Sequence, residues 1–185
     1  EASPLSREAF LREVSGHGTE YRPVWYEVDG PDGQTQQIAD IIRSSRGAER
    51  IGVLFRTQRQ LRGQSTRLKQ AGVDHQVALT AWSYDFNDPR PVLTTFHSVK
   101  GLEFDWVILA GLDDDVWDQE AGDPKQRRLF FVGITRTKNR LYLISTKGRA
   151  CSYLRENPAD LLQKPTASSG ATWAWAYEPS HDDED

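Results

Sequence analysis

The sequence is poor in sulfur and holds no long apolar run. Its single cysteine, Cys151, excludes an intramolecular disulfide and a cysteine-based zinc site, so a reducing, cytoplasmic setting is expected. Methionine is absent, and we expect the chain to be a fragment of a longer protein. No apolar stretch approaches the ~18 residues that a membrane span needs, and nothing resembles a signal peptide, so no membrane partner is expected.

Net positive charge is also lacking, because the formal net charge is −4. The acids are concentrated at the end of the chain, where residues 171–185 hold five acids (Glu178 and 182–185) and no lysine or arginine. Without these five, 23 basic residues face 22 acidic ones (27 − 5). Charge alone therefore neither supports nor excludes contact with DNA.

A chain of 185 residues, 37% hydrophobic and 27% charged, is typical of one soluble globular domain with a sizeable core. We divide it into a linker helix over 1–20 that leads from an upstream region, a domain over 21–163, and a tail over 164–185 that is rich in proline, serine and acids. The tail contains TWAWAY (172–177), whose three aromatic residues alternate as on one face of a strand.

Hydrophobic periodicity predicts alternating strands and helices within the domain. Strands are expected at 21–28, 51–55, 73–79, 92–93, 106–110 and 140–145, and helices at 36–46, 59–70, 125–139 and within 148–162. Pro23 indicates that the first strand lies at an edge. A turn is expected at 30–33 and an acidic loop over 113–115 and 118–124. The alternation predicts an α/β fold, a doubly wound and mainly parallel sheet with helices on both faces.

One polar stretch separates two of the predicted strands. Thr95, His97, Ser98 and Lys100 are donors, and Glu103 is a lone acid among them. Open α/β sheets bind ligands where strand ends feed polar groups into a crevice. This stretch is therefore the first candidate for a binding site.

Three blocks of sequence resemble motifs of the superfamily 1 helicases of the UvrD/Rep type. TTFHSVKGLEFDWVIL (94–109) is similar to motif V, roughly T-x-H-S-x-K-G-L-E-F-x-x-V; RRLFFVGITRTK (127–138) is similar to motif VI, and IGVLFRTQRQ (51–60) to motif IV. Their order is that of the family, which makes chance similarity improbable. The resemblance implies a RecA-like fold and the second motor domain of a helicase. The family's large accessory domain between motifs IV and V has no room here, because only 81–90 is available.

The resemblance implies a set of nucleotide contacts. Phosphoryl transfer needs cations aimed at the γ-phosphate, and arginine offers a planar, permanently charged fork. In the family, one arginine of motif IV and one of motif VI serve as such fingers, which maps onto Arg56 and Arg136. Glu103 matches the acid that contacts the ribose, and Gly101 supplies the permissive backbone of the turn. The structural alternatives are a solvated strand-end arginine for Arg56 and a helix-capping acid for Glu103.

The resemblance also implies contacts with single-stranded DNA. The family places Thr95, His97, Ser98 and Lys100 at the nucleic-acid backbone or at the hinge between nucleotide and strand, where donors hold phosphates without reading bases. A structural histidine and a salt bridge from Lys100 to Asp105 are the alternatives.

No G-x-x-x-x-G-K-[ST] loop occurs in the chain, and no Walker B acids stand in the right setting. ATP and Mg²⁺ would therefore bind between this domain and an upstream RecA-like domain that supplies the metal ligands, with no metal ligand in this chain. The chain alone is expected to be inactive.

The expected function is that of the C-terminal motor domain of an ATP-dependent DNA helicase or translocase, with 3′-to-5′ polarity implied by the resemblance. The alternatives are a UvrD-like module that does not unwind DNA and acts on a protein partner, such as RNA polymerase or a repair protein, and a degenerate structural domain. The sequence further predicts that Arg56, Glu103 and Arg136 lie along one edge of the sheet, and that TWAWAY docks on this domain or on a partner.

Overall fold

The computed structural model describes residues 23–45, 47, 49–80, 83–120, 123–156 and 162. The elements of this part are, in chain order, β1 (Val24–Val28), α2 (Gly30–Ser44), β2 (Ile51–Phe55), α3 (Gln58–Gln70), β3 (Gln76–Ala78), β4 (Val92–Thr95), β5 (Phe104–Ala110), α4 (Asp114–Trp117), the 3-10 helix η2 (Asp118–Glu120), α5 (Pro124–Ile134), β6 (Thr137–Thr146) and α6 (Ser152–Arg155). None of these helices is long and apolar enough to cross a membrane. The linker helix predicted for 1–20 and the tail over 164–185 lie outside the described residues.

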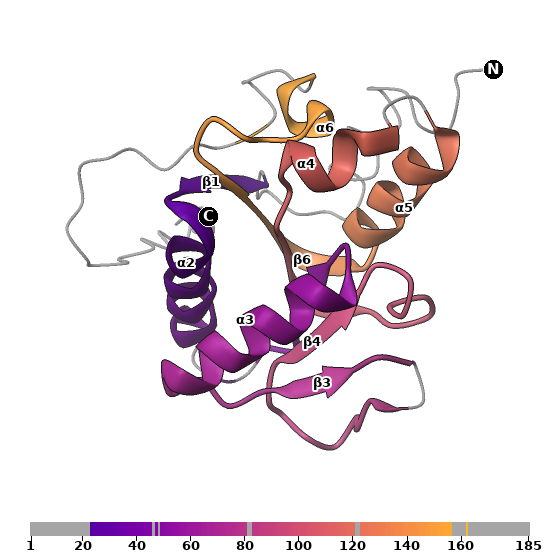
Figure 1. Cartoon of the computed structure of the whole chain (residues 1–185). Helices are drawn as coiled ribbons and strands as arrows, with labels where there is room; N and C mark the ends of the chain where they lie inside the picture. The colour runs from indigo at the N-terminus through magenta and orange to yellow at the C-terminus, as the bar shows by residue number, and fades with distance from the viewer. Residues whose placement is uncertain are drawn as a thin grey trace, which may run out of the picture.

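The six strands form one sheet in the order β1-β6-β5-β2-β4-β3, and every neighbouring pair is parallel (Figure 1). This confirms the predicted α/β fold. From the central strands the chain winds outward in both directions, through α3 to β3 and through α5 to β6. The strand after Pro23 lies at an edge of the sheet, as predicted, where a residue without an N–H interrupts no ladder.

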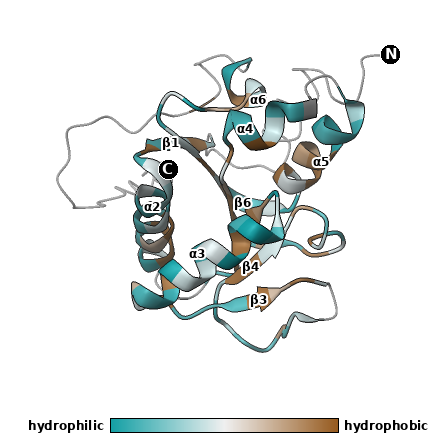
Figure 2. Ribbon diagram, in the orientation of Figure 1, coloured by the Kyte–Doolittle hydropathy of each residue, from teal (hydrophilic) through white to brown (hydrophobic). Residues whose placement is uncertain are grey.

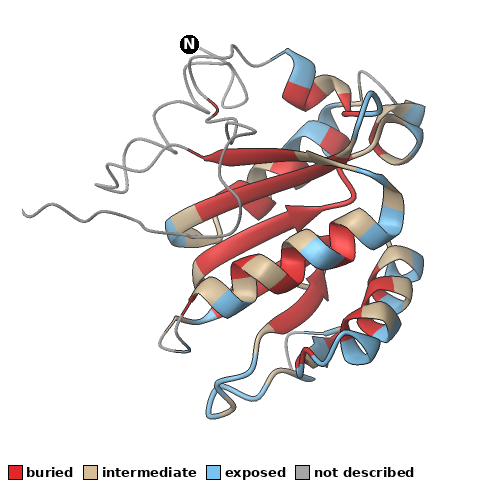
Figure 3. Ribbon diagram, turned by 90° about the vertical axis from the view of Figure 1, so that its left-hand side faces the viewer, coloured by how far each residue is buried: buried red, intermediate tan, exposed pale blue. Residues whose placement is uncertain are grey.

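Helices cover both faces of the sheet, so the central strands β2, β4 and β5 are buried along almost their whole length (Figures 1 and 3). Residues of β2 alternate between the two cores: Val53 and Phe55 pack with the cluster that holds α2 and α3, and Leu54 packs with the cluster that holds α4, α5 and α6. Brown and teal residues mix along α2 in Figure 2, as expected of an amphipathic helix with one face on the sheet.

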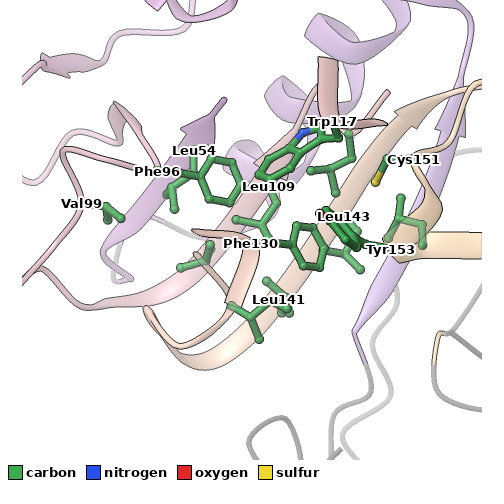
Figure 4. Packing of buried hydrophobic residues seen from close by; sticks show 14 of the residues in the cluster. Leu54, Phe96, Val99, Leu109, Trp117, Phe130, Leu141, Leu143, Cys151 and Tyr153 are labelled. Atoms are coloured by element: carbon green, nitrogen blue, oxygen red, sulfur yellow. The ribbon is translucent and has the colours of Figure 1, made fainter. Parts of the chain in front are cut away.

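The core beneath α4 and α5 is built around Trp117, which is 1% exposed (Figure 4). Its ring meets Phe96 and Phe130 edge to face, with centroids 4.9 and 5.5 Å away. Such aromatic pairs add roughly 0.5–1.5 kcal/mol each beyond the area that they bury. The prediction of an acidic loop over 113–115 and 118–124 is partly wrong, because residues 114–120 form the helical turns of α4 and η2. These turns allow the side chain of Trp117 to be buried.

The start of α2 also differs from the prediction. The sequence predicts a turn over 30–33 and a helix over 36–46, but the helix runs from Gly30 to Ser44. Pro31 stands in the first turn, where its missing N–H has no helical acceptor to lose and its fixed φ suits the helix. The Gly-Pro pair therefore begins a helix here.

The end of α5 is the second departure. The predicted helix over 125–139 ends at Ile134, and β6 begins at Thr137. Pairing with β5 decides the boundary, because Thr137 lies opposite Phe104, whose amide donates to the carbonyl oxygen of Arg136 at 2.9 Å. Arg136 therefore lies in the turn between helix and strand rather than on the helix.

Candidate functional site

The candidate residues divide between the two edges of the sheet. All strands run in one direction, so a residue that follows a strand lies at the carboxyl edge and one that precedes a strand lies at the amino edge. Arg56 follows β2, whereas Glu103 precedes β5 and Arg136 precedes β6. The register pairs Phe55 with Ala110, which places Arg56 beside Gly111, eight residues beyond Glu103. At ~3.3 Å per residue this is a separation of roughly 26 Å along the strands.

The prediction that Arg56, Glu103 and Arg136 share one edge is therefore wrong. The order of residues in the sequence already indicated this separation. Arg56 follows a predicted strand, whereas Glu103 and Arg136 precede strands of the same parallel sheet. Motif resemblance identified the residues without fixing their edge.

At the amino edge, Glu103 and Arg136 are neighbours through the backbone bond between Phe104 and Arg136. The guanidinium of Arg136 is held by its own helix end: Nε donates to the carbonyl oxygen of Val132 at 3.1 Å, and Nη2 donates to Oγ1 of Thr135 at 3.0 Å. Glu103 forms an ion pair with Lys138 at 3.4 Å, and these two side chains are 59% and 55% exposed. Both groups of this edge can thus reach a ligand outside the domain.

The turn between β4 and β5 connects the two edges. Gly101 has a φ of +88°, a conformation that glycine adopts without strain. Lys100 is exposed. The alternative, a salt bridge from Lys100 to Asp105, is not present among the described residues. Oδ2 of Asp105 accepts instead from the backbone amide of Arg50 at 2.8 Å.

At the carboxyl edge, Arg56 stands at the centre of a set of contacts. Its Nε and Nη2 donate to Oε1 of Gln126 at 3.1 and 2.8 Å, and its Nη1 lies 3.3 Å from Nε2 of His97. The guanidinium carbon lies 5.6 Å from the centre of the Trp117 ring, within range of a cation–π contact. Arg56 is therefore more than a solvated strand-end residue.

The hydroxyls of Thr95 and Ser98 are used to shape the same edge. Oγ1 of Thr95 donates to Oγ of Ser98 at 3.0 Å, and Oγ of Ser98 donates to the carbonyl oxygen of Leu79 at 2.6 Å. Thr95 is buried, whereas His97 is exposed. Of these residues, His97 is the one that presents a ring to solvent, and the two hydroxyls hold its turn in place.

A cleft of about 860 Å³ adjoins Arg56 at the carboxyl ends of β2, β5 and β6, between the starts of α2 and α3 and helix α4. Its charged lining consists of Arg56, Arg59, Arg67, Arg149, Asp113 and Asp115. Its volume is that of a small-ligand site, and its place is where open α/β sheets bind ligands. Several glutamines complete the wall.

Hydrogen bonds fix the glutamines that line this cleft. Thr57 and Gln60 form a capping box at the start of α3, and Nε2 of Gln60 donates to the carbonyl oxygen of Gly111 at 3.3 Å. Gln64 accepts from the hydroxyl of Thr35 at 2.7 Å. The wall is therefore preorganised.

Sequence reasoning missed Gln126, Trp117, Arg59 and Arg149, because no quoted motif gives them a role. Their signal is spatial: they come from α5, α4, α3 and the turn after β6, and they meet only in the fold. No group of three or more histidine, cysteine, aspartate or glutamate side chains among the described residues could hold a metal ion.

The chain is similar in sequence to known helicases. The model of the UvrD-like helicase C-terminal domain matches residues 83–148. The ATP-dependent DNA helicase PcrA of Bacillus subtilis is 38% identical over 87 residues, which are 38% of this chain and 12% of that protein. The ATP-dependent DNA helicase UvrD1 of Mycobacterium leprae is 37% identical over 86 residues, 38% of this chain and 11% of that protein.

A solved structure extends the likeness to most of the chain. The C-terminal domain of a possible DNA helicase from Lactobacillus plantarum WCFS1 superposes with a TM-score of 0.69 at 18% identity, covering 85% of this chain and 94% of that one. At this identity the likeness shows the fold. The match over residues 83–148, which hold motifs V and VI, supports a UvrD-like superfamily 1 helicase C-terminal domain in this part of the chain.

Proposed function

We propose that this domain is the second motor domain of an ATP-dependent translocase on single-stranded DNA, with the nucleotide at its amino edge and DNA at its carboxyl edge. The observation that carries the proposal is the division of the candidate residues: Glu103 and Arg136 lie at one edge, and Arg56 and His97 lie in contact at the other. Two separate ligand surfaces are what a motor needs if it is to bind nucleotide and DNA at once.

At the amino edge, Arg136 is the proposed finger toward the γ-phosphate. Its Nη1 makes no hydrogen bond within the described residues, so the guanidinium can turn toward an anion while Nε keeps its helix-end acceptor. Glu103 would accept from the ribose hydroxyls after leaving Lys138, and an ion pair this exposed is worth at most about 1 kcal/mol. ATP and Mg²⁺ would bind against an upstream motor domain that carries the phosphate loop and the metal ligands.

At the carboxyl edge, Arg56 is proposed to contact DNA together with His97 and Lys100. This replaces its predicted role as an arginine finger toward the γ-phosphate. Arg56 and His97 would contact phosphates, and Lys100 would add a further exposed cation in the same turn. Thr95 and Ser98 would act through the shape of that turn, since their hydroxyl protons are already donated to neighbours. Phosphate contacts of this kind hold DNA without selecting a sequence.

The test uses a protein in which this chain is joined to the upstream motor domain. Steady-state ATPase is measured with and without single-stranded DNA, and DNA affinity is measured by anisotropy. Arg136→Ala should lower turnover by roughly 10³–10⁵-fold and leave DNA binding intact, and Arg136→Lys should fail as well, since a point charge does not replace a fork.

Arg56→Ala is the matched variant for the other edge. It should weaken DNA binding and lower the salt dependence by about one phosphate contact, while ATPase without DNA stays at the wild-type level. Arg62→Ala, an exposed arginine on α3, serves as the control for loss of one positive charge. Wild-type turnover in Arg136→Ala would remove the finger, and loss of basal ATPase in Arg56→Ala would contradict the division into two edges.

A further inference from the structure

The arginines that line the cleft at the carboxyl edge differ in their partners: Arg67 pairs with Asp32, and Arg149 pairs with Asp114. Both carboxylate oxygens of Asp113 are used by Thr146, its amide at 2.6 Å and its hydroxyl at 2.9 Å. Asp115 is paired with Arg149 at 3.1 Å. Neither aspartate is thus left over for Arg56, whose partner Gln126 is neutral.

Arg59 is the second uncompensated cation. It lines the cleft, is exposed, and its guanidinium makes no ion pair or hydrogen bond within the described residues. It stands in the first turn of α3, a 13-residue helix whose amino end adds a partial positive charge to the same space. Neither Arg56 nor Arg59 is thus paired with a carboxylate among the described residues, although Asp113, which keeps its charge beside the neutral donors of Thr146, lines the same cleft.

The cleft wall also contains a donor without an acceptor. The indole nitrogen of Trp117 is buried and has no hydrogen-bond partner within the described residues. Figure 4 shows this nitrogen on the side of the ring turned away from Phe130 and Tyr153. Buried donors of this kind are rare, and this one belongs to a residue that lines the cleft.

The chain leaves the described body beside this wall. The amide and hydroxyl of Ser152 donate to the carboxylate of Asp118, the residue after Trp117, at 3.0 and 2.9 Å. Leu162 is 5% exposed and packs in the same core as Trp117. Asp182 comes 20 residues after Leu162, so an extended chain spans up to ~65 Å and its length does not limit docking.

We propose that the acidic end of this chain, residues 178–185, occupies the cleft and competes there with nucleic acid. The segment supplies five carboxylates and no lysine or arginine, the complement of Arg56 and Arg59. The competition with DNA rests on the proposed function, whereas docking of the tail does not. The tail would act as an intramolecular substitute for the phosphates.

The experiment uses the full chain with its five tail acids replaced by glutamine or asparagine. A fluorescent peptide of residues 171–185 is added, and anisotropy is measured at low salt. The neutralised chain should bind the peptide, and the wild-type chain should bind it at least ~10-fold more weakly, because its own tail competes at an effective concentration on the order of millimolar. Binding should vanish near 1 M salt.

Two arginines on α3 separate a specific site from general attraction. In the neutralised chain, Arg59→Ala should weaken peptide binding roughly 10-fold, as loss of a charge-assisted contact does, and Arg62→Ala, outside the cleft lining, should leave it unchanged. Equal losses in the two variants, equal binding by wild-type and neutralised chains, or no binding by the neutralised chain would each overturn the proposal.

Competition between the tail and DNA is measured in a separate experiment. Neutralising the tail should tighten binding of a single-stranded oligonucleotide, and that oligonucleotide should displace the peptide. If the peptide binds at Arg59 but DNA neither displaces it nor binds better, docking of the tail stands and the placement of DNA at this edge fails.

Discussion

Arg56 and Gln126, which stand 70 residues apart in the chain, meet at the carboxyl edge through two hydrogen bonds from one guanidinium to one amide oxygen. Gln126 is buried, and Arg56 stacks on Trp117 beneath it. The pair joins the end of β2 to the first turn of α5. It therefore fixes both the orientation of the Arg56 side chain and the position of the helix on the sheet.

Gln126→Ala should therefore lower the free energy of unfolding by about 1–2 kcal/mol, because a partly buried guanidinium loses its acceptor. Gln126→Glu should keep the wild-type stability, because the carboxylate can pair with Arg56. Urea denaturation of the isolated chain measures both, and Gln70→Ala, at an exposed position, is the control. Unchanged stability in Gln126→Ala would show that the contact between Arg56 and Gln126 does not stabilise the fold.

Two helical glycines should respond to alanine with opposite signs. A Cβ on Gly133 would stand 2.7 Å from Cδ1 of Phe96, so Gly133→Ala should cost about 1–3 kcal/mol through overpacking. A Cβ on Gly63 meets only the flexible end of Arg67 at 3.3 Å, and Gly63→Ala should stabilise α3 by up to about 1 kcal/mol. Thermal unfolding of the two variants checks the pair; the same sign in both would be inconsistent with these contacts.

His75 makes stability depend on pH. It is 6% exposed, Nδ1 donates to the carbonyl oxygen of Val73 at 2.8 Å, and Nε2 accepts from the hydroxyl of Ser65 at 2.8 Å. Burial lowers the pKa of His75 below its ordinary 6.5. The unfolded chain therefore takes up this proton first, so stability should fall as the pH drops below about 6.5 and level off below the folded pKa.

The measurement is the urea midpoint at pH 7.5, 6.5 and 5.5, a range in which ordinary carboxylates stay ionised. His75→Gln should be less stable at pH 7.5 and should lose stability less steeply toward pH 5.5 than the wild type. A slope as steep as that of the wild type would assign the pH dependence to other groups.

Cys151 should be chemically silent in the folded protein. It is fully buried, and burial raises the pKa of its thiol to about 12, so almost no thiolate exists at pH 8. Reaction with Ellman's reagent should follow the rate of unfolding, whereas Gln70→Cys should add one thiol that reacts at once. Rapid reaction of Cys151 in the wild type would contradict its burial.

The sequence predicted the central strands well, because their apolar runs are too continuous to mistake: 51–55 was predicted and found with the same bounds. It failed where tertiary pairing overrides local preference. Residues 137–139 were predicted to continue the helix, yet they belong to β6, in which Thr137 pairs with Phe104 of β5. The predicted strand 73–79 shrinks to Gln76–Ala78 because only those residues pair with β4.

For the site, motif resemblance proposed Arg136, Glu103 and His97 as candidates, but it could not state which of them lie at the same edge of the sheet. Gln126 illustrates the limit. Nothing marks a glutamine in the first turn of a helix as the acceptor for an arginine 70 residues earlier, and only the folded sheet brings the two together.

Helix α5 connects the two edges of the sheet through hydrogen bonds at its two ends. The helix has 11 residues and is roughly 16 Å long; Gln126 lies near one end, and the acceptors of Arg136, Val132 and Thr135, lie at the other. One short helix therefore supplies hydrogen-bond acceptors to both arginines, so the side chains of Arg56 and Arg136 share a single support although they lie at opposite edges of the sheet.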